Sequence, residues 1–256
     1  MLRKTSDLVN FKLGALDGEI GHLRDFYFDD QSWTVRYLVA DTGNWLHGRQ
    51  VLLSPCSVKS VEESERIVRF DLSVKQIEET PSIDTDKPVT RQHELEYAQY
   101  YGWPMYWYGP ALWGPVPYPI LDRKTVESAG VKAPPEQTAN PHLRSVDEVT
   151  GYHIHTRDGE IGHVEDFVVD AYDWAIRYVV VDTRNWWPGK RVLVSPTWIE
   201  RISWEEAAAH VDLDRETIRE APGFDPSSPI TRPYEASLFE YYGREAYWSR
   251  EHKAAA

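Results

Sequence analysis

Asp17-Gly-Glu-Ile-Gly-His22 recurs letter for letter as Asp158-Gly-Glu-Ile-Gly-His163. The two copies are 141 residues apart, and at this offset residues 2–107 align with residues 143–248 without a gap. Forty of the 106 aligned positions are identical, which indicates an internal duplication. Solenoid repeats have periods of about 20–50 residues. A period of this length therefore indicates two copies of a whole domain.

Each copy has the sequence pattern of a small β-meander. In the first copy an apolar alternating run at 11–16 leads into Asp17-Gly18, a dipeptide typical of tight hairpin turns. Alternating, β-branched or aromatic stretches follow at 19–28, 33–40, 49–53 and 66–72. Five or six short strands in about 75 residues predict a small closed or nearly closed barrel, because closure removes exposed strand edges.

Helices are expected after each set of strands. Ser73 predicts the start of a short helix at 74–79, with Ile77 positioned to close one end of the barrel. A polar, proline-containing arm at 80–90 then leads to a second helix at 91–101. The second repeat predicts the same elements. Whether these arm and helix segments exchange between the repeats stays open.

The predicted fold class is mainly β, with two small barrels in tandem, each followed by an extended arm and a short helix. The predicted boundaries are 1–102 for the first repeat, 103–141 for an aromatic, proline-rich segment and linker, 142–248 for the second repeat, and 249–256 for a tail.

The repeated block resembles the PRC-barrel domain family. The resemblance lies in Asp-Gly-x-x-Ile-Gly, followed by Asp-Phe and by a strand that ends in Asp-Thr, and it covers residues 2–80 and 143–221. Members of this family include the cytoplasmic domain of the photosynthetic reaction-centre H subunit and the C-terminal domain of a ribosome maturation factor. Their shared property is contact with proteins or ribonucleoproteins rather than catalysis. The resemblance therefore implies a binding module.

The composition limits the kinds of partner. The formal net charge is −13 and no long Lys/Arg cluster interrupts it, so the backbone of DNA or RNA would be repelled. No apolar run approaches the roughly 20 residues that span a bilayer, and no N-terminal run resembles a signal peptide. Cys56 is the single cysteine, which suggests neither a disulfide nor a thiol metal site. We expect a soluble, cytoplasmic protein that binds no cofactor, nucleic acid or membrane interior.

Tryptophans outside the predicted strands are the candidate partner-binding residues. Two matched loops carry Asn-Trp pairs with little local core to enter, and the segment 103–119 is too aromatic for a solvated linker. The rings of 103–119 either lie across the junction between the two barrels or form an exposed binding strip. The loop tryptophans either fold over a barrel mouth or between the two copies, or they anchor a partner. The candidates are Asn44, Trp45, Trp103, Trp107, Asn185, Trp186 and Trp187.

Catalytic and metal chemistry have weaker support. His22 and His163 occupy matched positions, but neither has a second ligand nearby in sequence. His153-x-His155 would place two imidazoles on one face of a strand, a spacing that suits metals, and whether they bind one stays open. No nucleophile-base set recurs, and no phosphate-binding glycine motif occurs.

We therefore expect a non-catalytic adaptor or scaffold that binds a protein partner, as a monomer with pseudo-two-fold symmetry or as a homo-oligomer. One alternative is an accessory factor of a membrane-bound photosynthetic or electron-transport complex or of a ribonucleoprotein assembly. A further alternative is a small-ligand binder.

Overall fold

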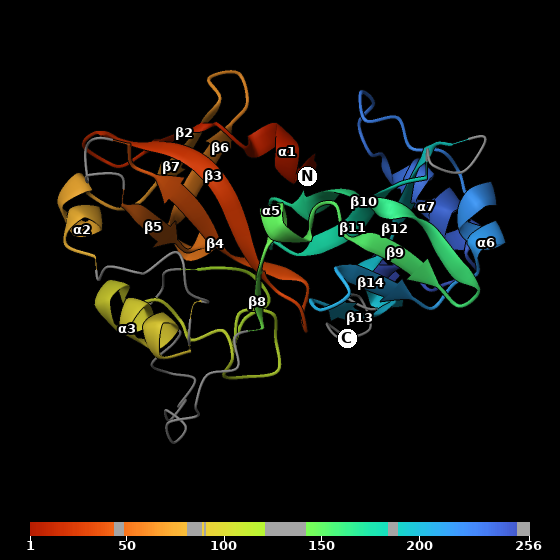
Figure 1. Ribbon diagram of the computed structural model, residues 1–256. Coiled ribbons are helices and arrows are strands. Elements are labelled where there is room, and N and C mark those ends of the chain that lie inside the picture. The colour runs from red at the N-terminus through yellow and green to blue at the C-terminus, as the bar shows by residue number, and fades with distance from the viewer. Residues whose placement is uncertain (44–48, 81–88, 90, 121–141, 184–188, 250–256) are drawn as a thin grey trace. The chain divides into compact units, whose positions relative to one another are not determined.

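The computed structural model describes residues 1–43, 49–80, 89, 91–120, 142–183 and 189–249. The protein is mainly β, as the sequence predicts, and its strands form two seven-stranded mixed sheets (Figure 1).

The chain divides into two compact units whose boundaries differ from those of the repeats. The first unit consists of Met1, residues 3–148 and residues 169–176; the second consists of Leu2, residues 149–168 and residues 177–256. Two pieces of the second repeat, the segment up to Glu148 and the turn at 169–176, thus fold with the first unit.

The first sheet has the strand order β5-β4-β3-β2-β7-β6, with β8 also paired to β3. All its pairs are antiparallel except β2 with β7, which is parallel. The strands are β2 (Lys12–Gly14), β3 (Glu19–Asp29), β4 (Thr34–Asp41), β5 (Gln50–Leu53), β6 (Val58–Glu62), β7 (Ile67–Phe70) and β8 (Leu143–Ser145).

The second sheet repeats this order as β12-β11-β10-β9-β14-β13, and β1 pairs with β10. Its strands are β1 (Leu2–Lys4), β9 (His153–Thr156), β10 (Gly159–Asp170), β11 (Ile176–Asp182), β12 (Arg191–Val194), β13 (Ile199–Ser203) and β14 (Ala208–Val211). Over the residues described, the pairing path of each sheet stays open, so the tandem-barrel prediction is not confirmed. The short strands β1, β6, β8 and β13 lack the alternation that would have predicted them.

The predicted helices are present. Ser73 caps α2 (Val74–Glu78) through a reciprocal capping box with Gln76, and Ile77 is fully buried. The predicted second helices are α3 (Arg91–Tyr101) and α7 (Arg232–Tyr241). The other helices are α1 (Thr5–Leu8), α5 (Val146–Val149), α6 (Arg215–Glu220) and the 3₁₀ turns η1 (Pro55–Ser57) and η2 (Pro196–Trp198). None of the described helices has the length and apolar character needed to cross a membrane.

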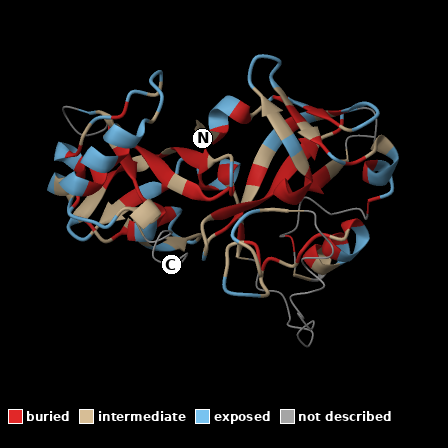
Figure 2. Cartoon of the chain, turned by 180° about the vertical axis from the view of Figure 1, so that it is seen from behind, coloured by how far each residue is buried: buried red, intermediate tan, exposed pale blue. Residues whose placement is uncertain are grey.

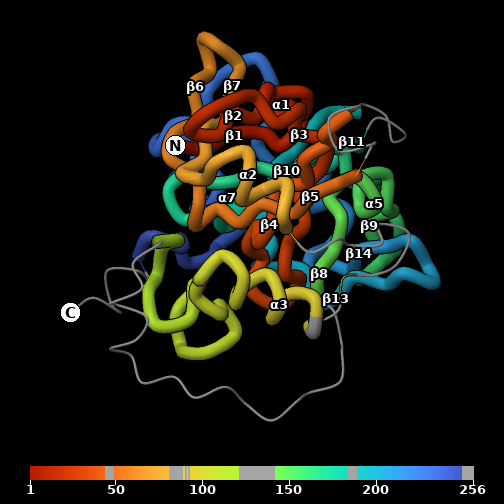
Figure 3. The backbone as a smooth tube through the Cα atoms, turned by 90° about the vertical axis from the view of Figure 1, so that its left-hand side faces the viewer, coloured from red at the N-terminus to blue at the C-terminus, as the bar shows by residue number. Residues whose placement is uncertain are grey.

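Strand β4 lies at the centre of the first unit and is buried along almost its whole length. A strand with one solvent face would alternate between buried and exposed residues. In this unit α3 and the segment at 103–120 lie against the sheet, and Figure 3 shows them side by side. Figure 2 shows the buried residues concentrated on the strands and the exposed residues on helices and turns. The aromatic segment therefore covers one part of the first sheet.

Glycine is required in the repeated block because two backbones approach closely there. Gly21 has a φ of +126°, and a Cβ at this position would lie 2.0 Å from the carbonyl oxygen of Asp41. A Cβ at Gly162 would lie 2.1 Å from the carbonyl oxygen of Asp182 in the same way. The identical glycines thus let β3 and β10 pass against the end of the neighbouring strand.

Replacing Gly21 by alanine should lower the free energy of unfolding by at least about 2 kcal/mol, because the methyl group collides with backbone that cannot rotate away. Gly43→Ala is the matched control, since Gly43 also has a positive φ, of +55°, but open space around it; it should cost about 1 kcal/mol. Urea unfolding curves of the two variants compare these values. Equal losses would show that the close approach is absent.

Candidate functional site

The repeated block ties a hairpin turn to a helix in each unit. The Oδ1 of Asp17 accepts a hydrogen bond of 2.7 Å from the backbone N–H of Val74, the first residue of α2. In the second unit the Oδ1 of Asp158 accepts one of 2.8 Å from the N–H of Arg215, the first residue of α6. Both carboxylates satisfy a helix N-terminal donor. The most specific part of the repeat therefore has a structural role.

A polar hollow of about 470 Å³ opens beside this block in the first unit, a size within the range of ligand pockets. It brings together two carboxylates, one amide and one imidazole from different parts of the sheet. The hollow is lined by Asn10, Glu19, Ile20, Gly21, His22, Asp41, Thr42 and Gly43.

Five of the seven candidate partner-binding residues, Asn44, Trp45, Asn185, Trp186 and Trp187, lie outside the described residues. The structure describes the bases of their loops. The hydroxyl of Thr42 donates to the carbonyl of Arg49 at 2.6 Å, and that of Thr183 donates to the carbonyl of Lys190 at 2.8 Å. An equivalent threonine hydrogen bond thus joins the two ends of each loop.

A buried cluster of charged and aromatic side chains recurs in both units. In the first unit the Oε1 of Glu94 on α3 accepts hydrogen bonds from the hydroxyls of Tyr37 on β4, at 3.2 Å, and Tyr106, at 2.5 Å. Its Oε2 lies 2.9 Å from Arg91. The guanidinium of Arg36 stacks 3.8 Å above the centre of the Tyr106 ring. These contacts fix α3 and the aromatic segment to β4.

Every member of this cluster has its counterpart 141 residues later. Glu235 accepts hydrogen bonds from Tyr178 at 2.8 Å and from Tyr247 at 2.9 Å. Arg232 lies 3.1 Å from Glu235, and Arg177 stacks 4.1 Å from the centre of the Tyr247 ring. We call these two groups the Glu94 cluster and the Glu235 cluster.

Burial dominates the electrostatics of the Glu94 cluster. Removal from water raises the pKa of the Glu94 carboxyl from 4.5 to about 7, although Arg91 and the two tyrosine hydroxyls oppose this shift. Burial also raises the pKa of Tyr106 well above its usual value and lowers that of Arg36. Arg36 is almost completely buried and donates to the carbonyl of Leu112 at 2.6 Å.

Trp103 belongs to the core, which corrects its assignment as an exposed anchor. It is 5% exposed, stacks on Tyr101 at 4.1 Å and donates from Nε1 to the hydroxyl of Ser57 at 2.6 Å. The second repeat places a tryptophan in a similar environment, although at another position of the alignment. In the second unit the position of Ser57 is taken by Trp198, which contacts Tyr242 at 4.4 Å. Each unit thus packs one tryptophan against the matching tyrosine, but Trp103 and Trp198 occupy different positions in the repeat alignment.

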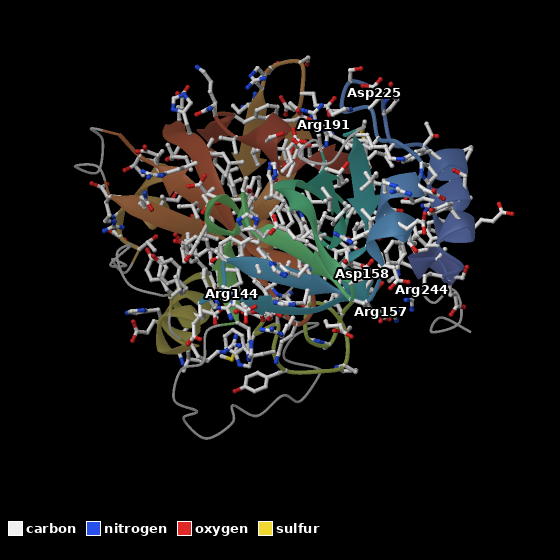
Figure 4. All side chains as sticks on the ribbon, turned by 45° about the vertical axis from the view of Figure 1, so that its right-hand side comes forward. Arg144, Arg157, Asp158, Arg191, Asp225 and Arg244 are labelled. Atoms are coloured by element: carbon white, nitrogen blue, oxygen red, sulfur yellow. The ribbon has the colours of Figure 1, made fainter. Side chains whose placement is uncertain are left out.

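The position of Trp103 is taken in the second repeat by Arg244, which has a different role. Its Nη2 donates to the carboxylate of Asp212 at 3.0 Å, and Arg157 binds the same carboxylate. Figure 4 shows Arg157 and Arg244 close together at this end of the second unit. Arg244 is thus paired at the surface of the second unit and does not enter its core.

Trp107 is half-buried and lies at the edge of the Glu94 cluster. The guanidinium of Arg91 is 4.4 Å from its ring centre, and Arg232 lies 4.1 Å from Trp248 in the same way. Trp107 is therefore partly accessible, but its position is explained by a cation–π contact that both units repeat.

The histidines singled out from the sequence contact separate partners. His153 and His155 take different partners: Nδ1 of His153 lies 2.8 Å from Glu160, and the ring of His155 faces His210. His163 lies 3.9 Å from the carboxylate of Asp182. In the part of the chain that the structure describes, no group of three or more His, Cys, Asp or Glu side chains is arranged to hold a metal ion.

Asp25 and Ser54 are two polar side chains that stabilise local structure. Asp25 accepts from the Ser145 hydroxyl at 2.6 Å and from the N–H of Asp147 at 3.0 Å, and so fixes the start of α5. Ser54 accepts from the N–H of Cys56 and caps η1. Burial raises the pKa of the Cys56 thiol to about 12, which makes it unreactive.

An exposed aromatic surface lies elsewhere in the first unit. Tyr172 is 69% exposed, and its ring centre lies 5.8 Å from that of Tyr118, at the end of the aromatic segment. Met1 is also exposed, and its carbonyl accepts a hydrogen bond from Ala171 at 3.0 Å. We call Met1, Tyr118 and Tyr172 the Tyr118–Tyr172 patch.

Other exposed tyrosines are explained by hydrogen bonds. The hydroxyl of Tyr100 donates to the carbonyl of Gln76, and that of Tyr241 donates to the carbonyl of Thr217 in the second unit. Each ties the second helix of its unit to the first. The Tyr118–Tyr172 patch has no such repeated tie, because Tyr118 lies outside the aligned repeats and the first repeat has Gln31 at the position of Tyr172.

Sequence reasoning missed the two clusters and the patch, for different reasons. Arg91, Glu94, Tyr106 and Trp107 are identical in the second repeat, so the alignment could have identified the cluster. Nothing in the alignment marks Tyr172, because the first repeat has Gln31 at that position.

Comparison with known proteins gave no matching family model and no matching curated protein.

The free energy of unfolding should decrease as the pH rises, because of Glu94. Its folded pKa lies above its unfolded value, so its contribution is fully present below about pH 4.5 and is lost as the pH rises through about 7. The loss should reach about 3 kcal/mol by pH 8. Glu94→Gln should remove most of this slope, as measured by urea unfolding at pH 5 and pH 8. Glu96→Gln, an exposed position on the same helix, should keep the slope; equal slopes in wild type and Glu94→Gln would contradict the burial effect.

Trp103→Ala should lower the free energy of unfolding by about 3–5 kcal/mol, as expected for loss of a buried tryptophan. Trp107→Ala, at a half-buried position, should cost less. The double variant Ser57→Trp/Trp103→Arg, which copies the second repeat, should recover at least about 1 kcal/mol relative to Trp103→Ala. A Trp103→Ala protein as stable as wild type in urea would return Trp103 to the exposed candidates.

Proposed function

We propose that this chain is a non-catalytic protein-interaction module and that the Tyr118–Tyr172 patch is its contact surface. The observation that carries the proposal is the exposure of two neighbouring tyrosine rings in the first unit, with Tyr172 69% and Tyr118 38% exposed. Tyrosine is enriched at protein interfaces because it offers a large contact area at a small cost in side-chain entropy.

The patch is held by a rigid base within the first unit. Trp113, in the same segment as Tyr118, is 1% exposed and donates from Nε1 to the carbonyl of Asp173, the residue after Tyr172, at 2.8 Å. The turn that carries Tyr172 is further fixed by a bridge between Thr34 and Ala175. A surface that is ordered before binding loses less entropy when a partner arrives.

The finer fold assignment belongs to the same proposal. The repeated strand order, the helix that follows each sheet and the Asp-Gly-x-x-Ile-Gly block support two PRC-type barrels. A cytoplasmic location is part of the same proposal. The interaction role of the family that the block resembles favours binding over catalysis.

The polar hollow beside His22 supports a second candidate function, the binding of a small ligand. Its volume of about 470 Å³ suits a small molecule, and its carboxylates, from Glu19 and Asp41, suit a cationic group.

The test is recovery of a partner from a lysate of the source cells. Wild type and Leu16→Ser should capture the same protein, whereas Tyr118→Ser/Tyr172→Ser should lose at least about tenfold of it, because interface tyrosines are frequent hot spots. Leu16 is the matched control, since it is 59% exposed at a different place in the first unit. Circular dichroism checks the fold of each variant. Full capture by the double variant would exclude the patch as the contact surface.

A further inference from the structure

The second unit contains a facing pair of histidines. His155 lies on β9 and His210 on β14, which run parallel, and the two residues are direct partners in the strand register. Their ring centres are 5.2 Å apart, with planes inclined by 33°. Both side chains are partly accessible to solvent.

The first repeat shows that this pair is a departure from a shared arrangement. The positions of His155 and His210 are held there by Gly14 and Arg69, which are also register partners on parallel strands. Arg69 donates to Glu65 at 3.0 Å. Glu65 is retained in the second repeat as Glu206, but both of the facing positions are imidazoles.

Glu206 determines which nitrogen of His210 is available. Its Oε2 lies 2.6 Å from Nε2 of His210, so Nε2 carries the hydrogen of this bond, and in the neutral ring Nδ1 keeps its lone pair. A carboxylate that accepts from one ring nitrogen while the other binds a metal is the usual outer support of a histidine ligand. Arg201 also contacts Glu206, at 3.3 Å, and leaves the bond to His210 in place.

We propose that His155 and His210 chelate a divalent transition-metal ion of the Zn²⁺, Ni²⁺ or Cu²⁺ class, with Glu206 positioning His210. Imidazole suits these ions, and each metal–nitrogen bond is about 2.0–2.1 Å long. Two rings on adjacent strands, about 4.8 Å apart, reach one ion after small side-chain rotations. Water fills the remaining positions, since the described residues offer no third protein ligand there.

His153 is outside this pair although it shares a strand face with His155. Its Nδ1 lies 2.8 Å from Glu160, and its register partner on β14 is Ala208. The site is therefore the pair across two strands rather than the pair within one strand. It is independent of the proposed protein-binding role.

Isothermal titration calorimetry of the full chain with ZnCl₂ and, separately, NiCl₂ tests the site. Because the chain contains nine histidines, the comparison between variants carries the result. His155→Gly/His210→Arg, which restores the first-repeat residues and so should fold, should weaken the tightest binding at least about tenfold, because even loss of an outer ligand support costs that much. His153→Ala is the matched control and should bind as wild type does.

A second measurement locates the ion. In heteronuclear NMR of wild type, Zn²⁺ should shift the imidazole signals of His155 and His210 before those of the other histidines. Glu206→Gln should weaken Zn²⁺ binding less than loss of either imidazole. Unchanged affinity in His155→Gly/His210→Arg, no heat in wild type, or first shifts at other histidines would each overturn the proposal.

Discussion

The burial of one glutamate against β4 is the constraint on which the first unit depends. A carboxylate removed from water costs several kcal/mol unless partners surround it. Glu94 obtains these partners from three places: Tyr37 on the strand, Arg91 on its own helix and Tyr106 in the segment that follows. The carboxylate is surrounded by these partners only if all three are assembled. The cluster therefore specifies how α3 and the aromatic segment lie on the sheet.

The duplication shows which parts of this arrangement are fixed. The Glu235 cluster keeps the same side chains and nearly the same distances, since a half-satisfied buried charge would be costly in either unit. Apolar packing has been less constrained. Trp103 and Trp198 fill matching places from different positions of the chain, because a packed core requires a ring of that volume but accepts it from either direction.

Residues that the two repeats do not share are the places where function is proposed. The Tyr118–Tyr172 patch is built from one segment that follows the first repeat and one turn of the second, and the histidine pair of β9 and β14 replaces Gly14 and Arg69. Within the shared Asp-Gly-Glu-Ile-Gly block, the aspartates bind the first backbone N–H of a helix and the second glycines permit close backbone approach. The most recognisable sequence feature is thus structural, and the proposed sites lie where the repeats diverged.

The sequence by itself determined the duplication, the mainly β class, most strands and the helices after each sheet, because these follow from local patterns: alternation, Asp-Gly turns and a Ser73 cap. Only the tertiary structure decided that β8 and the turn at 169–176 join the first unit, that Trp103 is core and that Tyr172 is exposed. These outcomes depend on contacts between residues far apart in the chain. Periodicity and propensity describe neighbours a few positions apart, so they contain no information on which distant segment covers a given ring.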